Sequence, residues 1–382
     1  MASLLKWFRH TVITTFMAVS VVAVLVVVDQ AADLRLVADA SAQDAPKKKE
    51  RETRKTPALR NNIYEKLAEA QVFAEAQQFA EAEEVLNEML DATSKKSKLN
   101  KYELANVYNT YAYLRYAVED YAGALNYYRK VIDQRPEIPL ALEIGTLYTV
   151  AQLYFLQEEW QKGIDTLNQW MAASDNPSTN AYVLLANGYY QLKDYDKSLF
   201  NIETAIERDQ AAGKLPKEQW YNLARFIYFD RDEYRKALDI LDILIMYYPK
   251  KSYWLQASAL YSELGDEPRQ LAMLEVSYEQ GLLDRSQDIV NLASMYLNAE
   301  VPYWGAKAMD TGFSDGIVEE ESKNYELAGA AWRQAQEVEK SLPMLEAAAS
   351  TSEKGELYAR LGNVYLDVDK NKQAVEALEK GL

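Results

Sequence analysis

Apolar side chains recur at helical spacing along most of the chain, from Asn61 to Leu382. They fall at i, i+3, i+4 and i+7, and no alternating apolar and polar run is long enough to predict a strand. Turn residues interrupt the pattern at intervals that fit two helices and a short connection. The pattern therefore predicts an all-α chain of helix-turn-helix pairs.

The clearest pair starts with YVLLANGY over residues 182–189, turns over 191–195 and places Ser198, Ile202 and Ala205 on its second helix. The same arrangement returns around 220–249 and 358–381. An aromatic side chain marks the first helix of most units, at Phe73, Tyr154, Tyr189, Tyr228, Tyr261, Tyr296, Trp332 and Tyr365. One further unit surrounds Tyr111, so we expect about nine units.

Small side chains recur where the two helices of a unit should cross, because only small residues allow close approach of two helix backbones. They are Ala82, Ala124, Gly163, Ser198, Ala237, Ser341 and Ala374. With the aromatic markers, the Leu-Gly or Leu-Ala pairs and the closing prolines, these positions resemble the tetratricopeptide repeat, whose period is 34 residues. The resemblance implies a right-handed superhelical solenoid with a concave groove that binds other proteins.

Two units depart from this pattern and suggest a division of the array. Gln270 stands where a small residue is expected, and Val301-Pro302 occupies the next turn, before an expected Gly-rich linker through Gly312 and Gly316. We expect one array over 61–310 and a second over 311–382. The last unit ends at residue 382 inside its second helix, which suggests a truncated array, because solenoids need a terminal cap.

The first 42 residues have the pattern of a signal peptide. Basic residues precede 17 uncharged residues over 12–28, and Ala40-Ser41-Ala42 offers a cleavage site. Cleavage would place the protein in the periplasm, whereas retention would anchor it in the inner membrane. A basic segment over 43–60 follows, with seven Lys or Arg against two Glu over 46–60, and is expected to be flexible.

Composition narrows the possible functions of the chain. Its 42 Lys and Arg against 58 Asp and Glu give a net charge of -16, which argues against nucleic-acid binding. There is no Cys, and the only histidine, His10, lies in the expected leader. Cysteine and histidine nucleophiles, thiolate metal sites and disulfides are therefore excluded from the mature chain.

The sequence carries few motifs that would indicate catalysis or a cofactor. The chain has no phosphate-binding loop, dinucleotide fingerprint or calcium loop. Carboxylate pairs at Glu83-Glu84, Glu158-Glu159 and Glu319-Glu320-Glu321 could serve a glycosidase or an oxygen-ligated metal. Adjacent acids on a helix usually face water, so we expect no enzyme, no metal and no cofactor.

The repeat family lines its groove with first-helix positions, which here carry many aromatic side chains. Tyr, Phe and Arg provide large contact areas with few rotatable bonds, so they suit peptide binding. The candidate partner-binding residues are Tyr113, Tyr116, Tyr148, Phe155, Asn187, Tyr190, Tyr221, Arg225 and Tyr228. Packing of these side chains between helices is the alternative interpretation. A clamp for a terminal carboxylate is disfavoured, since the basic companions of Asn187 and Asn363 are absent.

Two stretches carry a narrower resemblance. Residues 51–60 (RETRKTPALR) and the run from Ala299 to Glu319 are similar to those of periplasmic tetratricopeptide proteins associated with TonB-type energy transduction. This resemblance implies an accessory to a TonB-ExbB-ExbD complex that supports uptake of iron carriers across the outer membrane. Scaffolds for envelope assembly, secretion or polysaccharide export, an acid-based enzyme acting on envelope polysaccharide, and a membrane-anchored cytoplasmic adaptor remain alternatives.

Overall fold

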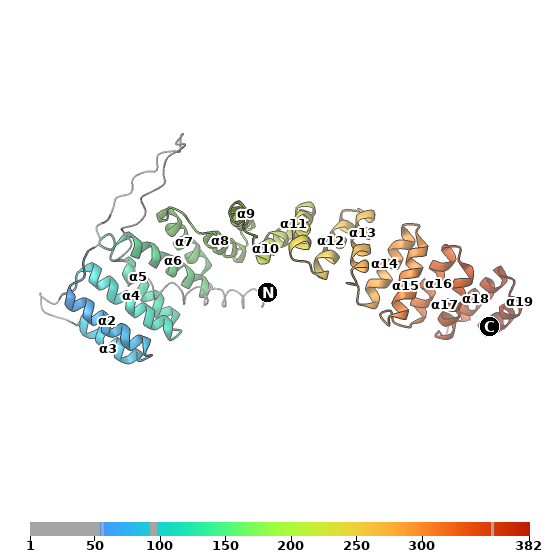
Figure 1. Ribbon diagram of the computed structural model, residues 1–382, viewed down its shortest axis with the longest axis horizontal. Helices are drawn as coiled ribbons and strands as arrows, with labels where there is room; N and C mark the ends of the chain where they lie inside the picture. Colours follow the sequence, from blue (N-terminus) through green and yellow to red (C-terminus); the bar gives the residue numbers. More distant parts are fainter. Residues whose placement is uncertain (1–53, 55–56, 92–97, 353–354) are drawn as a thin grey trace, which may run out of the picture. The chain divides into compact units, whose positions relative to one another are not determined.

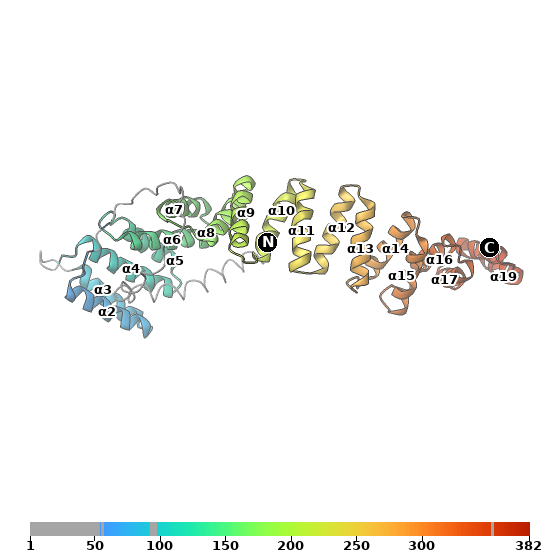
Figure 2. The same cartoon turned by 45° about the horizontal axis from the view of Figure 1, so that its top comes forward.

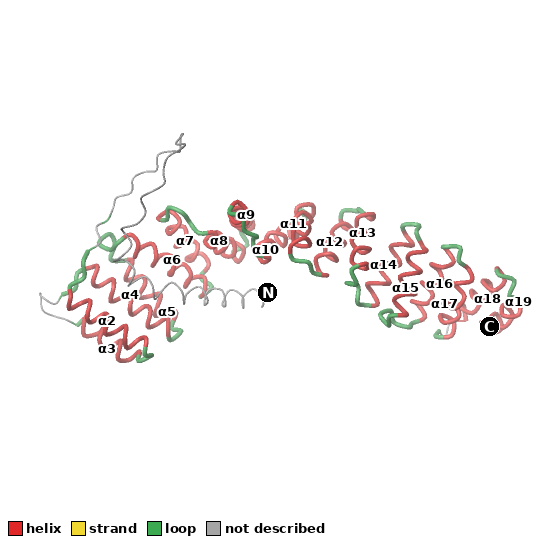
Figure 3. Tube along the Cα trace, in the orientation of Figure 1, coloured by secondary structure: helices red, strands yellow, loops and turns green. Residues whose placement is uncertain are grey.

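A computed structural model describes residues 54, 57–91, 98–352 and 355–382 of the chain. Within these residues it contains 18 α-helices and no strand, which confirms the prediction of an all-α fold (Figure 3). The expected signal peptide over 1–42 and most of the basic segment over 43–60 lie outside the described residues. No helix among the described residues is long and apolar enough to cross a bilayer.

The helices form nine successive antiparallel pairs, the number that the sequence predicts (Figure 1). Contacts divide the chain into two compact units, the first up to Lys214 and the second from Leu215. The first unit contains four pairs: α2 (Asn61–Glu75) with α3 (Phe79–Leu90), α4 (Lys101–Ala117) with α5 (Tyr121–Ile132), α6 (Leu140–Leu156) with α7 (Trp160–Ala173), and α8 (Thr179–Gln191) with α9 (Tyr195–Ala211).

The second unit contains the remaining five pairs (Figure 2). These are α10 (Glu218–Asp230) with α11 (Tyr234–Tyr247), α12 (Lys251–Glu263) with α13 (Glu267–Glu279), α14 (Ser286–Asn298) with α15 (Pro302–Ser314), α16 (Ser322–Gln334) with α17 (Val338–Ser350), and α18 (Gly355–Asp367) with α19 (Asn371–Gly381). Within each unit, every first helix after the opening pair also packs against the second helix of the preceding pair, as a stacked repeat requires.

The division expected near residue 310 falls within a continuous helical pair and needs correction. Residues 311–314 belong to α15, and Gly312 is buried there rather than placed in a linker. A Cβ atom at Gly312 would lie 2.5 Å from Cγ2 of Val318. The glycine thus serves close packing against the following segment, a role that the sequence pattern did not separate from that of a turn.

All seven small residues predicted at the helix crossings are buried, and they set how closely the helices of a pair approach. Ser198 shows how a polar residue is accommodated there, since its hydroxyl donates to the carbonyl of Ala186 at 2.8 Å. In the seventh pair Gly305 takes this place, and a Cβ atom on it would lie 2.9 Å from the carbonyl oxygen of Ala293. The crossing therefore persists in a unit whose turn departs from the pattern.

Every pair turns through one residue in the left-handed backbone region, with φ between 56° and 68°. These nine residues are Gln77, Glu119, Glu158, Lys193, Asp232, Gly265, Glu300, Gln336 and Asp369. Only the sixth is glycine, although this conformation costs about 1–2 kcal/mol for other residues. The turn residue gives a common register from which positions on every first helix can be counted.

This cost predicts opposite effects for two substitutions in the second unit. Gly265→Ala should lower the free energy of unfolding by about 1 kcal/mol, because nothing lies within 4 Å of the added Cβ and only the backbone is penalised. Glu300→Gly should raise it by up to about 1 kcal/mol at an exposed position. Urea unfolding of the full chain measures both. Changes of the same sign would contradict the role assigned to the turn.

Candidate protein-binding surface

One aromatic position recurs in the second to fifth pairs, three residues before the left-handed turn residue. It is occupied by Tyr116, Phe155, Tyr190 and Phe229. Each ring contacts the aromatic residue that begins the following helix, and the ring centroids lie 5.5 to 6.4 Å apart, in the pairs Tyr116–Tyr121, Phe155–Trp160, Tyr190–Tyr195 and Phe229–Tyr234. The repeated contact fixes these rings against the turn.

Six of the nine predicted partner-binding residues are half-buried and so retain surface for a ligand: Tyr113, Tyr116, Tyr148, Asn187, Tyr190 and Arg225. The ring of Tyr148 packs 4.8 Å from that of Trp170, and burial raises the pKa of Tyr148. Asn187 donates its side-chain amide to the carbonyl of Val183 at 2.8 Å. Their role in binding remains a prediction, and their internal contacts hold them in place for it.

Phe155 does not line a surface, because its side chain is only 1% exposed. Its ring lies between two glycines of the first unit. A Cβ atom on Gly163 would lie 3.0 Å from the ring, and one on Gly188 would lie 2.7 Å from it. The expectation that Phe155 contacts a partner is therefore wrong, since this side chain packs α6 against its neighbours.

Tyr221 and Tyr228 are also core residues, 1% and 8% exposed. The sequence pattern did not distinguish Phe226 and Phe229, which are 43% and 49% exposed on the same helix, α10. Counting back from Asp232 places these two at the register positions that Asn187 and Tyr190 hold in the preceding pair. A slip of one residue rotates a side chain by about 100° around a helix, so the correct signal was the spacing to the turn residue.

Another set of aromatic residues, four before the turn residue, stabilises the turns themselves. In five pairs a cation eight residues later lies over the ring at 4.8 to 5.9 Å: Lys162 over Tyr154, Lys197 over Tyr189, Lys236 over Tyr228, Arg269 over Tyr261 and Lys340 over Trp332. Each cation also pairs with an acid three residues before it, namely Glu159, Asp194, Glu233, Asp266 and Glu337. We call this arrangement the turn triad.

Arg225 is a cation of a different kind, on the surface of α10. Its guanidinium donates to the side-chain oxygen of Asn222 at 3.2 and 3.4 Å and forms no ion pair with a described carboxylate. Because it is largely desolvated without a compensating charge, the pKa of Arg225 is lowered. The adjacent Phe229 provides exposed apolar surface, so this face can accept a carboxylate beside an apolar group.

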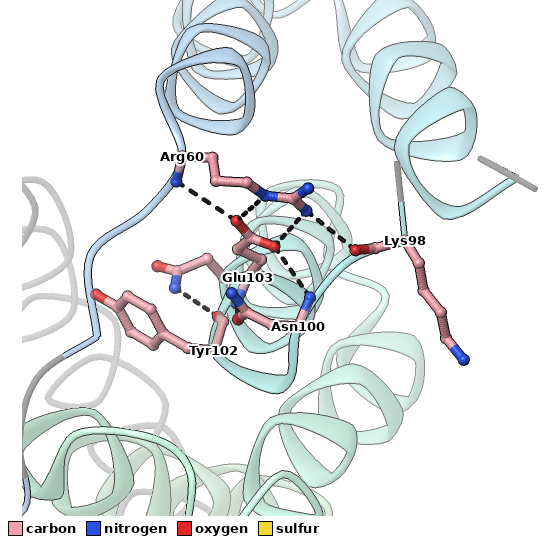
Figure 4. A network of polar contacts seen from close by, with 6 residues as sticks. Arg60, Lys98, Asn100, Tyr102 and Glu103 are labelled. Atoms are coloured by element: carbon pink, nitrogen blue, oxygen red, sulfur yellow. Dashed lines mark hydrogen bonds and ion pairs between the residues drawn. The ribbon is translucent and has the colours of Figure 1, made fainter. Parts of the chain in front are cut away.

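The basic segment is held to the first unit at its described end (Figure 4). Arg60 forms a forked ion pair with the fully buried Glu103, with Nε–Oε1 and Nη2–Oε2 distances of 2.7 Å, and donates to the carbonyl of Lys98 at 3.0 Å. Glu103 also accepts from the backbone of Asn100 at 2.9 Å. Since Arg54 pairs with Glu143 as well, the expectation of a flexible segment does not hold at Arg54 and Arg60.

The ion pair with Arg60 lowers the pKa of Glu103, whose charge is compensated inside the fold. The carboxylate pairs that could have served catalysis are placed differently. Glu84, Glu158 and the residues 319–321 are exposed, while Glu83 and Glu159 are half-buried in ion pairs with Arg115 and Lys162. Among the described residues, no cluster of three or more acids or histidines is suited to a metal.

Comparison with known families decides the identity of the repeat. The model of the tetratricopeptide repeat matches residues 179–211 and 355–382, which are the fourth and ninth helical pairs. The other described pairs share the left-handed turn, and all of them except the sixth, where Gln270 is half-buried, share a small buried residue at the crossing. The chain contains tetratricopeptide repeats. Such arrays generally bind peptides or other proteins, and this chain is a protein-interaction scaffold.

Individual relatives are distant. The crystal structure of the MamA protein is 17% identical and aligns with 46% of this chain and 91% of that chain at a TM-score of 0.38. A tetratricopeptide repeat protein from Parabacteroides merdae is 16% identical over 84% of this chain and 98% of its own, also at 0.38. The vacuolar protein sorting-associated protein 11 homolog of Dictyostelium discoideum is 27% identical over 193 residues, 46% of this chain but only 19% of that protein.

Proposed function

We propose that this scaffold works in the periplasm, where it binds a segment of another envelope protein through the exposed faces of its first helices. The observation that carries the proposal is the register of the aromatic side chains. Tyr116 and Tyr190 in the first unit and Phe229 in the second occupy one repeated position, retain exposed surface and are each fixed by a second ring. Rigid aromatic anchors of this kind bind partners at low entropic cost.

The chemistry of α10 narrows the bound segment within the second unit. Arg225 has no carboxylate partner among the described residues and lies one helical turn from Phe229. A partner that brings an acidic side chain next to an aromatic or aliphatic one would satisfy both. A charge-assisted hydrogen bond to a half-buried guanidinium is stronger than one formed in open water.

The compartment and the pathway are proposed from the sequence. The leader over 1–42 with its Ala40-Ser41-Ala42 site supports export, and cleavage would leave a mature chain that begins at Gln43. The stretches over 51–60 and 299–319 support an accessory role in a TonB-ExbB-ExbD complex, as their resemblance to TonB-associated proteins implies. Scaffolds for secretion or polysaccharide export would use the same surface, so the partner distinguishes them.

Crosslinking in intact cells tests this proposal. A photoreactive amino acid at position 190 should capture a protein of the envelope, and the recovered chain should start at Gln43. The same amino acid at Glu207, an exposed residue on α9, the second helix of the same pair, is the matched control and should capture markedly less of that protein. Recovery of an intact leader with cytoplasmic partners, or equal capture from both positions, would refute the proposal. Capture of secretion or polysaccharide-export subunits would refute its TonB-specific form.

A further inference from the structure

The turn of the seventh pair lacks the turn triad and is apolar instead. Where the five triads have an acid and a cation three residues apart, this turn has Val301 and Trp304. Tyr296, the ring that the cation would cover, is 8% exposed and keeps its place in the core. The substitution of apolar for charged residues therefore changes the surface of the turn while the helices pack as elsewhere.

Residues 301–304 of this turn, which we call the tip, expose three large apolar side chains. Val301 is 41% exposed, Tyr303 39% and Trp304 56%. Exposed apolar side chains gathered in this way are costly in water and often mark an interaction site. The tip lies at the start of a second helix, α15, so it is separate from the first-helix positions that carry the proposed function.

The rings of the tip are held in a fixed arrangement rather than free to rotate. Tyr303 lies edge-on between Trp304, at a centroid distance of 5.7 Å and 87°, and the buried Trp332, at 5.4 Å and 84°. The indole N–H of Trp332 donates to the carboxylate of Asp310 at 3.1 and 3.2 Å, and Lys340 lies over Tyr303 at 5.6 Å. Little side-chain entropy remains to be lost on binding.

The positive charge of Lys307 beside the tip indicates the chemistry of the partner. The ammonium of Lys307 lies 6.0 Å from the centre of the Trp304 ring and forms no ion pair with a described acid. In a chain of net charge -16, an unpaired cation next to an exposed indole favours an acidic ligand. An anionic membrane is less suited to this tip, because stable adsorption to lipid needs several basic residues around the aromatic ones.

We propose that Val301, Tyr303, Trp304 and Lys307 form a second docking surface, which binds a protein segment that carries an acidic residue next to an aromatic or aliphatic one. Trp304 supplies the apolar contact, edge-on to Tyr303, and Lys307 pairs with the acid. This inference stands independently of the proposed function of the first-helix faces.

A double substitution replaces two exposed apolar side chains of the tip and is expected to leave the fold intact. Val301→Glu with Trp304→Lys restores the acid and the cation of the turn triad opposite Tyr296, so the melting temperature of the full chain should be unchanged or higher. A display library of random 12-residue peptides is selected on the full chain, and the recovered peptides are synthesised and measured for affinity. We expect acidic residues next to aromatic or aliphatic ones, and at least tenfold weaker binding to the double variant.

Two further variants test the charge preference of the tip and whether the peptides bind there rather than at the first-helix face of α10. Lys307→Glu should reverse the selected charge from acidic to basic, whereas Phe229→Ala, on the first-helix face of α10, should leave the affinity of these peptides unchanged. Peptides that bind the double variant equally well, or a failure to select any peptide, would overturn the proposal. Binding to phosphatidylglycerol vesicles that depends on Trp304, in place of peptide binding, would also overturn it and assign the tip to lipid.

Discussion

Phe155→Ala is expected to lower the free energy of unfolding of the first compact unit by about 3–5 kcal/mol. The ring is 1% exposed and fills the space next to Gly163 and Gly188, where the absence of Cβ atoms allows it to enter. Its removal leaves a cavity that two glycines cannot fill. Denaturant unfolding followed by circular dichroism measures the loss.

Tyr190→Ala provides the matched control, because Tyr190 holds the same register position in the next pair but is half-buried. Its loss should cost clearly less than the loss of Phe155, since part of its surface is already in contact with water. Equal costs for the two substitutions would mean that burial does not separate structural from binding aromatics in this repeat.

Glu103→Ala is expected to lower the free energy of unfolding of the first unit by about 2 kcal/mol. The change removes a carboxylate with no exposed surface and leaves Arg60 and the backbone N–H of Asn100 without their acceptor. The cost is below the 3–5 kcal/mol typical of a broken buried pair, because Arg60 remains partly exposed and can be rehydrated.

A double-mutant cycle with Arg60→Ala isolates this pair. The double variant should be more stable than the sum of the two losses predicts, since each single change already breaks the same ion pair. Additive losses would show that Glu103 acts through the capping of α4 alone, where it is also the acceptor for the backbone of Asn100.

The same pair predicts a loss of stability in acid. The folded-state pKa of Glu103 is lowered from its ordinary value of 4.5, so the unfolded chain takes up the proton first as the pH falls. The contribution of Glu103 is present above about pH 4.5 and is lost as the pH falls through the folded pKa. Glu103→Gln should reduce this dependence, which pH-resolved unfolding curves would detect as a flatter acid limb.

The number of helical pairs and their crossing residues could be predicted from the sequence because both follow from local spacing. The helix crossing requires a small residue at the positions of Ser198 and Ala237 whatever the neighbouring residues are, and both side chains are buried. The prediction that Gly312 lies in a linker was wrong, because the sequence alone does not distinguish a glycine needed for close packing from one needed for a turn. Its role depends on Val318, which only the fold brings next to it.

The candidate site was predictable only in part, and the reason is geometric. Tyr116 and Tyr190 are half-buried on their helices and keep exposed surface, while their role in binding stays a prediction. On α10, where several aromatic residues lie close together, the sequence predicted Tyr228 rather than Phe229 as a binding residue. The two differ by one position, and Tyr228 is buried in the core while Phe229 is exposed. The burial of the Phe155 side chain could not be predicted, since it depends on two glycines of neighbouring helices.

The most direct test of the binding face compares two adjacent side chains of α10 for binding of the protein segment that a photoreactive amino acid at position 226 of the same helix captures. Phe229→Ala should weaken binding of that segment to the full chain at least tenfold with little change in melting temperature, because Phe229 is half exposed. Tyr228→Phe, one residue away and buried, should leave the affinity unchanged. An affinity that is lost with Tyr228→Phe but kept with Phe229→Ala would contradict the register on which the binding face is defined.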